Sequence, residues 1–387
     1  MGCSAKWRSS ALYRPKRNLR ILRIILAVRE TSAPYNQFCL PWAEEHDITI
    51  CTYFASNITP PRTITVFEGD GSLTGFFRVL KAALDAKQYD VIHAHSPHVG
   101  LLFLVSRLIS YRELAPSTVI TVHDSFPNYK LRNRLMFIPV FASFQRVVCC
   151  SRASFDSFPV FYRRLASDRI CFVQNGLDIA RIDRIAANTY QRPHRTSHFT
   201  IVAISRLVAI KNPFSVLTAF QASADRSSRL VHIGDGPLGE ALLRRSREGD
   251  PENQIELTGL IPREKVFEYL LNADLFISTS RGEGLPVSVL EAMASRCPVL
   301  LSDISPHREI AQGVDFIPLI HPDDVAGFAR QIKRFRGMPV SERTAIGHKC
   351  RKLVEERFSL KAMHAGYAEV YAQIAGNQVP CLLDGGR

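Results

Sequence analysis

Short apolar runs alternate with longer segments of helical period along most of this 387-residue chain. β-branched residues are frequent in these runs, and the segments between them are long enough to cross back over a sheet. This alternation is typical of parallel sheets built from βαβ units. In the first half, the predicted strands are Leu19–Val28, Ile48–Phe54, Thr63–Phe67, Val91–His95, Thr118–His123, Val147–Cys150 and Ile170–Gln174.

A polar, basic stretch at 181–197, which contains Pro193, interrupts the rhythm and is expected to be an interdomain linker. The chain is thus predicted to have an α/β fold with two doubly wound, Rossmann-like domains, 1–180 and 198–358, that face a cleft. The last amphipathic segment, 360–375, is expected to pack back on the first domain. The predicted strands of the second domain are Phe199–Ser205, Leu230–Ile233, Ile255–Thr258, Leu275–Thr279, Val299–Ser302 and Phe316–Leu319.

Charge is unevenly distributed between the two halves. The formal net charge is +13, and residues 1–180 carry 22 Lys and Arg against 13 Asp and Glu. The first half is therefore expected to meet an anionic partner, either a phosphate-bearing substrate or an acidic membrane surface. Nucleic acid also fits the charge, but the aromatic-interleaved basic motifs of nucleic-acid-binding proteins are missing, so no nucleic-acid partner is expected.

The hydrophobic residues point to packed cores and not to membrane spans. They make up 46% of the chain, yet no apolar run approaches the ~18–20 residues that a spanning helix needs. The nine cysteines are scattered and include no pair at zinc spacing. We therefore expect a cytoplasmic protein with free thiols in its core, possessing a basic N-terminal tail of undetermined role.

The loops after the second-domain strands carry residues suited to an anionic ligand. Arg206 and Lys211 follow the first of these strands, and Asn212-Pro213 reads as the cap and first residue of a helix. Guanidinium and ammonium groups beside a helix start can neutralise phosphate oxygens. The alternative is that both are solvated surface cations.

The next loop, Gly234-Asp-Gly236-Pro-Leu-Gly239, matches a dinucleotide fingerprint in its letters. That fingerprint normally opens the first βαβ unit of its domain, whereas this loop lies in the second, although Glu256 keeps a dinucleotide reading open. We expect Gly234 and Gly236 to allow a tight bend or a close backbone approach to a ligand.

Two carboxylates, Glu283 and Glu291, flank a predicted helix start at Pro286. The free N–H groups at residues 284–287, which include Gly284 and Leu285, form an anion cradle together with the helix dipole. A ligand with adjacent hydroxyls and a diphosphate would satisfy these groups and the nearby cations, and a nucleotide sugar has that composition. Glu291 could alternatively be a buried acid paired with a basic neighbour.

The second half, over most of 170–375, resembles the retaining, group 1 (family four) glycosyltransferases of GT-B fold. The motifs are Ser205-Arg-Leu-x-x-x-Lys211-Asn-Pro, His232-Ile-Gly-Asp-Gly-Pro237, Leu257-Thr-Gly259 and Glu283-x7-Glu291-Ala. The resemblance implies that Glu291 binds the ribose hydroxyls, that Glu283 contacts the donor sugar, and that Arg206 and Lys211 neutralise the diphosphate. It also places the loop around Gly259 near the base.

The first half resembles the family in Asp90-Val-Ile-His-Ala-His95, Thr121-Val-His123-Asp and Val173-Gln-Asn175-Gly176. By this resemblance His123 lies near the donor sugar. His93, His95 and His98 could suggest a metal, but no carboxylate stands at ligand spacing, so no metal is expected. The loop 29–38 lacks the Gly-rich turn that family members often carry, which predicts acceptor recognition by side chains.

The resemblance implies transfer of a sugar from a UDP- or GDP-sugar to a saccharide or lipid-linked hydroxyl with the anomeric configuration kept and without a cofactor. A nucleotide-sugar epimerase and a dinucleotide-dependent dehydrogenase remain alternatives. The helical segment 129–144 carries Lys130, Arg132 and Arg134 ahead of an apolar run, so it is either a peripheral contact with an anionic membrane or an ordinary core helix.

Overall fold

The first domain is built on a seven-stranded parallel sheet. The computed structural model describes residues 18–30, 32–110, 117–189, 198–248 and 254–374, and the basic N-terminal tail lies outside these ranges. The strand order is β3-β2-β1-β4-β5-β6-β7. The strands are β1 (Arg20–Ile25), β2 (Asp47–Thr52), β3 (Thr65–Phe67), β4 (Val91–Ala94), β5 (Ser117–Val122), β6 (Arg146–Cys149) and β7 (Ile170–Phe172).

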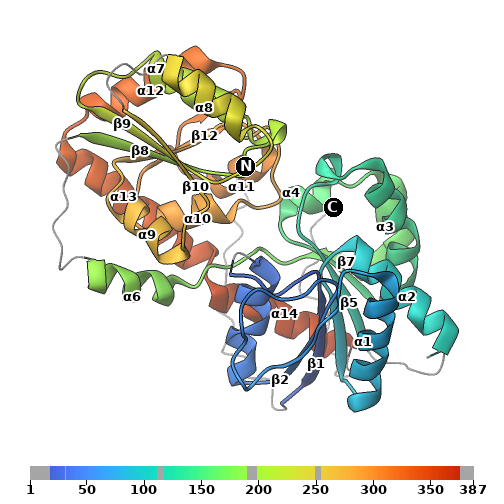
Figure 1. Cartoon of the computed structure of the whole chain (residues 1–387). Coiled ribbons are helices and arrows are strands. Elements are labelled where there is room, and N and C mark those ends of the chain that lie inside the picture. Colours follow the sequence, from blue (N-terminus) through green and yellow to red (C-terminus); the bar gives the residue numbers. More distant parts are fainter. Residues whose placement is uncertain (1–17, 31, 111–116, 190–197, 249–253, 375–387) are drawn as a thin grey trace, which may run out of the picture.

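Helices cover both faces of this sheet (Figure 1). Its inner strands are buried almost throughout, as is usual for a parallel sheet between two helical layers, whereas the edge strands β3 and β7 are partly exposed. The helices are α1 (Leu73–Ala86), α2 (Pro97–Ser110), α3 (Leu131–Ser143), α4 (Arg152–Ser157) and α5 (Val160–Ala166). The described cysteines are free thiols, and all except Cys171 are buried.

The second domain has a six-stranded parallel sheet in the order β10-β9-β8-β11-β12-β13. Its strands are β8 (Phe199–Ile204), β9 (Ser228–Ile233), β10 (Ile255–Gly259), β11 (Leu275–Ser278), β12 (Val299–Ser302) and β13 (Leu319–Ile320). Its helices are α7 (Pro213–Gln221), α8 (Gly239–Glu248), α9 (Arg263–Leu271), α10 (Val287–Ala294), α11 (Ser305–Ile310), α12 (Val325–Gly337) and α13 (Val340–Arg357).

The chain crosses back to the first domain at its end. Helix α14 (Leu360–Ile374) lies beside the first sheet, away from the second domain (Figure 1). Its buried tyrosines, Tyr367 and Tyr371, pack with apolar residues of β1, β4 and β5. Burying an aromatic side chain contributes several kcal/mol at most, so these two anchor the returning helix. None of the helices in the described residues has the length and apolarity that crossing a bilayer requires.

Two predicted segments differ from the structure. The expected linker at 181–197 begins with helix α6 (Ile179–Thr189), whose Ile182 and Ala186 are buried. The apolar residues recur at helical spacing and pack toward α9, so they outweigh the polar composition. Residues 190–197 lie outside the described ranges. The predicted strand Phe316–Leu319 is reduced to Leu319–Ile320, because only its end pairs with β12.

Glu309, on α11 of the second domain, holds the two domains together. Its carboxylate accepts hydrogen bonds from the backbone N–H groups of Arg152 (3.0 Å) and Ala153 (2.7 Å), which begin helix α4 of the first domain. It also accepts one from Gln174 Nε2 at 2.8 Å. A carboxylate at a helix N-terminus satisfies free amides and interacts favourably with the helix dipole.

We expect Glu309→Ala to loosen the domain contact without unfolding either domain. The substitution leaves two backbone donors and one amide without their partner, at a cost of about 1–3 kcal/mol. Small-angle X-ray scattering should report a larger radius of gyration. Asp303→Ala is the matched control, because Asp303 pairs with Arg308 inside the second domain. An unchanged radius for Glu309→Ala would contradict the assignment.

Candidate functional site

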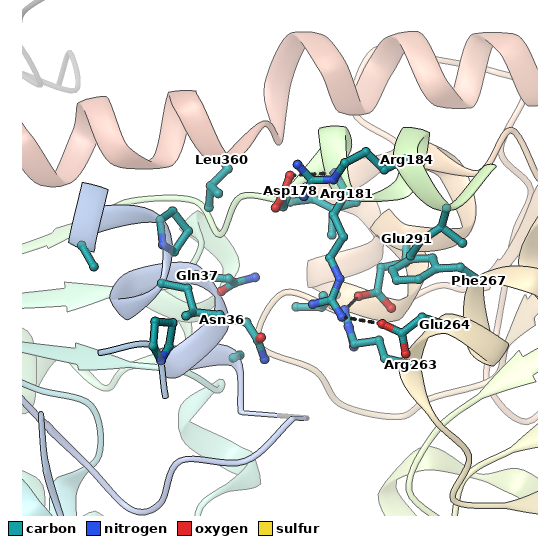
Figure 2. Close-up of a pocket in the computed structure, with 18 of the residues that line it drawn as sticks. Asn36, Gln37, Asp178, Arg181, Arg184, Arg263, Glu264, Phe267, Glu291 and Leu360 are labelled. Atoms are coloured by element: carbon teal, nitrogen blue, oxygen red, sulfur yellow. Dashed lines mark hydrogen bonds and ion pairs between the residues drawn. The ribbon is translucent and has the colours of Figure 1, made fainter. Parts of the chain in front are cut away.

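A cavity of about 1430 Å³ lies between the two domains. Figure 2 shows Asn36 and Gln37 on its first-domain side and Arg263 and Glu291 on its second-domain side. The segment that connects the domains contributes Arg181 to its wall. The other lining residues are Ala33, Leu40, Pro41, Ala43, Glu44, Pro61, Thr63, Ile64, Leu177, Asp178, Arg184, Ile185, Ile204, Glu264, Phe267, Val287, Ser288 and Leu360.

Glu291 projects from α10 toward this cavity and is ion-paired with Arg263, the first residue of α9. Its side chain is only 4% exposed. Burial raises the pKa of the Glu291 carboxyl above the ordinary 4.5, while Arg263 lowers the pKa part of the way back. The structure therefore agrees with the alternative that Glu291 is a buried acid paired with a basic neighbour. The same carboxylate lines a hollow that a ligand can enter.

Lys211 and Glu283 form a second ion pair on the same domain. Lys211 ends the short turn Ala209–Lys211 after β8, and Glu283 lies in the loop between β11 and α10. Ser280 Oγ donates to the other oxygen of Glu283 at 2.7 Å. The donors to the Glu283 carboxylate therefore come from its own domain.

Arg206 and Lys211, the two cations predicted to neutralise a diphosphate, have different surroundings. Arg206 is exposed, and within the described ranges no hydrogen bond or ion pair of its side chain is found. The cavity beside Glu291 has neither Arg206 nor Lys211 in its lining, although Ile204 at the end of β8 belongs to it. The structure thus pairs Glu291 with Arg263 and Glu283 with Lys211, and a joint role of Arg206 and Lys211 at a diphosphate stays a prediction.

The loop that carries Glu283 contacts the first domain directly. Ser125 Oγ donates to the carbonyl of Glu283 at 2.7 Å, and Ser151 Oγ donates to the carbonyl of Gly284 at 2.9 Å. A Cβ on Gly284 would lie 2.4 Å from the carbonyl oxygen of His123, so glycine is required there. Gly284, the first residue of the segment predicted to bind an anion, therefore packs against the first domain.

The two residues after Gly284 have packing roles as well. Leu285 is buried in the core of the second domain, and Pro286 is the cap residue that precedes α10. The predicted helix start is therefore displaced by a single residue. The first backbone N–H groups of α10 point out of the N-terminal end of the helix, as in any α-helix.

Gly234 and Gly236 serve chain packing. Both have positive φ, and a Cβ would lie 2.0 Å from the Ser205 carbonyl oxygen at Gly234 and 2.6 Å from the Leu207 carbonyl oxygen at Gly236. The glycines therefore let this loop approach the neighbouring loop after β8, which agrees with the predicted tight bend. A close approach of the same loop to a ligand stays a prediction. Gly259, with φ of +66°, has open space around its missing side chain.

Asn212 precedes α7 as predicted, but its side chain does not cap the helix. It adopts a left-handed conformation with φ of 53°. Its amide donates instead to the carbonyls of Pro322 (3.0 Å) and Thr279 (3.3 Å), which ties the loop after β8 to the loops after β11 and β13. The Asn212 side chain is buried among these loops. A capping prediction made from the local sequence cannot take such distant acceptors into account.

His123 directly follows β5 and lies next to the loop of Glu283. Burial lowers the pKa of its imidazole to about 4, so the ring is neutral at physiological pH. His93 and His95 are also buried, whereas His98 is half-buried on α2. In the described part of the chain, no group of three or more histidine, cysteine, aspartate or glutamate side chains is placed to hold a metal ion.

Sequence reasoning missed two residues of the site. Arg263, the partner of Glu291, follows directly on the loop that was assigned to the base. Asp124 follows His123, and burial raises the pKa of its carboxyl, with Lys211 and Glu283 close enough to act on it in opposite directions. Its position in the His-Asp pair after β5 is the signal that could have drawn attention to it.

Comparisons with known proteins identify the class. Residues 198–336 match the family model described as glycosyl transferases group 1, and residues 42–181 match the one described as glycosyltransferase family 4. Together the two matches span most of the chain and correspond to its two domains. This chain therefore belongs to the group 1 glycosyltransferases.

Individual relatives agree with this assignment. The chain is 22% identical over 354 residues, 87% of its length and 88% of the relative, to the UDP-Gal:alpha-D-GlcNAc-diphosphoundecaprenol alpha-1,3-galactosyltransferase of Escherichia coli. It is 33% identical to the putative teichuronic acid biosynthesis glycosyltransferase TuaC of Bacillus subtilis, over about a third of each chain. The structure of Anabaena HepE in complex with UDP and glucose superposes with a TM-score of 0.72 at 17% identity, covering 92% of this chain and all of HepE. The fold is GT-B.

The Glu291–Arg263 pair yields a pH-dependent stability prediction. A carboxyl whose pKa is raised in the folded state contributes most below its unfolded pKa, and this contribution is lost as pH rises through the folded pKa. Arg263→Met removes the cation that opposes the shift, so the variant should lose more stability as pH rises above about 4.5. Urea unfolding at pH 5 and pH 7 would measure it.

The double variant Arg263→Met with Glu291→Gln is the matched control. A neutral amide cannot titrate, so the extra pH dependence should disappear. Equal losses of stability at the two pH values for the single variant would show that the Glu291 carboxyl is not the titrating group.

Proposed function

We propose that this protein transfers a sugar from a nucleoside diphosphate donor to a hydroxyl of a saccharide or lipid-linked acceptor, with the anomeric configuration kept. The observation that carries the proposal is the pair of charged clusters at the strand ends of the second domain, Glu291 with Arg263 and Lys211 with Glu283. The first would meet the ribose hydroxyls of the donor and the second its diphosphate and sugar. Both are turned toward the first domain.

A uridine nucleotide is the first donor to test. The name of the Escherichia coli relative specifies UDP-galactose and a diphosphoundecaprenol acceptor, and HepE was solved with UDP and glucose. These names support a UDP-sugar and a polyprenyl-diphosphate-linked saccharide for this chain, in the assembly of a polysaccharide or glycolipid. A GDP-sugar is the second candidate, and the same assay distinguishes the two.

In this proposal, departure of the diphosphate is assisted by positive charge already in place. Breaking the bond from sugar to phosphate builds negative charge on the leaving diphosphate, and Lys211, Arg206 and the first amides of α10 can stabilise it. Lys211 would exchange its contact with Glu283 for one with phosphate, which frees the Glu283 carboxylate for the sugar. No metal or cofactor is needed for these steps.

The proton of the acceptor hydroxyl would pass to the leaving phosphate oxygen on the same face of the sugar. This front-face attack requires no protein base and keeps the anomeric configuration. The direct contact between the two domains at Gly284 would help to exclude water, which would otherwise compete as acceptor.

The two enzyme alternatives make different demands on the site. A dinucleotide-dependent dehydrogenase would use the loop at Gly234 to hold pyrophosphate, but this loop is filled by contacts with Ser205 and Leu207. An epimerase of the same fold would share the donor cluster and would act on the donor alone. Incubation of the donor with and without acceptor separates epimerisation from transfer.

We expect Lys211→Met to lower the rate of transfer by about 10²–10³ while leaving the fold intact, because it removes a cation from the leaving group. The assay is wild-type protein with UDP-glucose, UDP-galactose or GDP-mannose and a polyprenyl-diphosphate-linked acceptor, with the product linkage determined by NMR. An α-linked product from an α-linked donor supports retention.

Arg281→Met is the matched control, since Arg281 lies in the same region but is exposed and pairs with Asp323 at 2.6 Å. It should retain transfer. Release of an inverted product, or full activity of Lys211→Met, would contradict the proposed mechanism.

We also propose that the first domain touches an anionic membrane through α3 and α5, which would bring a lipid-linked acceptor to the cleft. Leu131 on α3 and Phe161 on α5 are 71% and 57% exposed, and Lys130 and Arg132 beside them are exposed cations. Exposed apolar side chains among cations suit the surface of an anionic bilayer. Arg134 is not available, because it donates to the carbonyls of Tyr129 and Pro127.

Reversing two charges should weaken this contact. Each basic side chain near an anionic bilayer contributes about 1 kcal/mol, so Lys130→Glu with Arg132→Glu should reduce binding to phosphatidylserine-containing vesicles at least tenfold in a sedimentation assay. Lys333→Glu with Arg334→Glu on α12 changes the charge equally at a distant surface and is the control. Equal effects of the two pairs would remove the proposed surface.

A further inference from the structure

Three histidine rings form a row that runs from the core of the first domain toward the loop of Glu283. His93 and His95 project from the end of β4, and His123 follows β5 beside them. The ring centroids of His93 and His95 are 4.1 Å apart at an interplanar angle of 21°, and those of His95 and His123 are 5.4 Å apart at 20°. Phe38 makes edge contacts with all three rings. The row is therefore held in one orientation.

The deep end of the row has a defined proton arrangement. Arg23 is fully buried, and its Nη1 contacts both His93 Nδ1 and the hydroxyl of Tyr371. A guanidinium can only donate hydrogen bonds, so His93 Nδ1 must be the acceptor and the proton of a neutral ring must lie on Nε2. His93 Nε2 accordingly has Thr121 Oγ1 as its acceptor at 2.7 Å.

The tautomer of His95 follows from the partners of its two ring nitrogens. Its Nδ1 lies 3.2 Å from His123 Nε2, so one of these two nitrogens donates to the other. Its Nε2 is enclosed and has no polar partner among the residues that the structure describes. A buried N–H without an acceptor is costlier and rarer than an unused lone pair. His95 therefore places its proton on Nδ1 and donates it to His123.

This donation determines which nitrogen of His123 carries the proton. Its Nε2 accepts the hydrogen bond from His95, so a neutral His123 ring must carry its own proton on Nδ1. His123 is the least buried ring of the row, and its carbonyl is next to Gly284 in the loop of Glu283.

We propose that His95 is a positioning residue that fixes His123 as a hydrogen-bond donor through Nδ1–H, directed at an oxygen of the bound sugar nucleotide. The proposal rests on the donor site of the proposed function. It assigns His123 the task of holding a hydroxyl or phosphate oxygen and excludes it as a proton acceptor, because its only lone pair is used by His95. No proton is transferred in this arrangement.

The direct test is the nitrogen spectrum of the histidines. Protein labelled with ¹⁵N in histidine is recorded with long-range ¹H–¹⁵N correlation near pH 7.5, and the His123 signals are assigned from their loss in His123→Gln. We expect a protonated Nδ1 and an unprotonated Nε2 for His123. The opposite tautomer, or a rapid average of the two, would overturn the proposal. This measurement needs no substrate, so it decides the inference even if the protein transfers no sugar.

A functional test separates hydrogen bonding from packing. The amide nitrogen of asparagine can take the place of His Nδ1, so His95→Asn should keep the donor and remain within about threefold of wild-type kcat/KM. His95→Phe keeps an aromatic ring in the row but loses the hydrogen bond, and kcat/KM should fall at least about tenfold. His98→Asn is the control, because no described contact links His98 to His123.

The spectra of the two variants complete the test. His123 should keep its Nδ1–H tautomer in His95→Asn and lose it, or average both forms, in His95→Phe. Equal activity of the two variants, or an unchanged His123 tautomer in His95→Phe, would overturn the role of His95. Failure of wild-type protein to transfer sugar, with the expected tautomer present, would instead contradict the proposed function alone.

Discussion

The contact at Gly284 leaves no space for a side chain between the two domains. Its missing Cβ would collide with the backbone of His123, and the serines at 125 and 151 bind the carbonyls on either side. Two sheets can face each other with their strand ends this close only where the connecting loops are thin. The position of this contact sets where the cleft is closed and where it widens into the cavity beside Glu291.

The charges around the cleft follow from that geometry. Glu291 is buried at the wide end and needs a cation, which Arg263 supplies, while Glu283 lies at the closed end and is paired with Lys211. An unpaired buried carboxylate would cost several kcal/mol or become protonated. Each carboxylate is therefore matched by a cation from its own domain, and for Glu291 this cation lowers the carboxyl pKa that burial raises.

The sequence predicted most of the fold because most strands are short apolar runs that contrast with the helical period of the segments between them. The site was only partly predictable. The motif around Glu283 and Glu291 identifies the carboxylates, but Arg263 and Asp124 become their neighbours through tertiary packing, and no local spacing specifies that. Gly234 and Gly236 show another limit of the sequence: their spacing suggests a ligand-binding loop, but it does not reveal the positive φ angles and close backbone contacts that require glycine at both positions.

The loop 29–38 shows how the first domain compensates for its missing glycines. Phe38 is buried against the histidine row and against Tyr367 of α14, while Gln37 Nε2 donates to the carbonyl of Gly176 at 2.9 Å. The loop is thus fixed from beneath by side chains. The amide of Asn36 donates to the carbonyls of Glu30 and Ser32 in the same loop, and Oε1 of Gln37 is buried without a described partner. Side-chain contacts therefore hold this loop in place where family members often carry a Gly-rich turn.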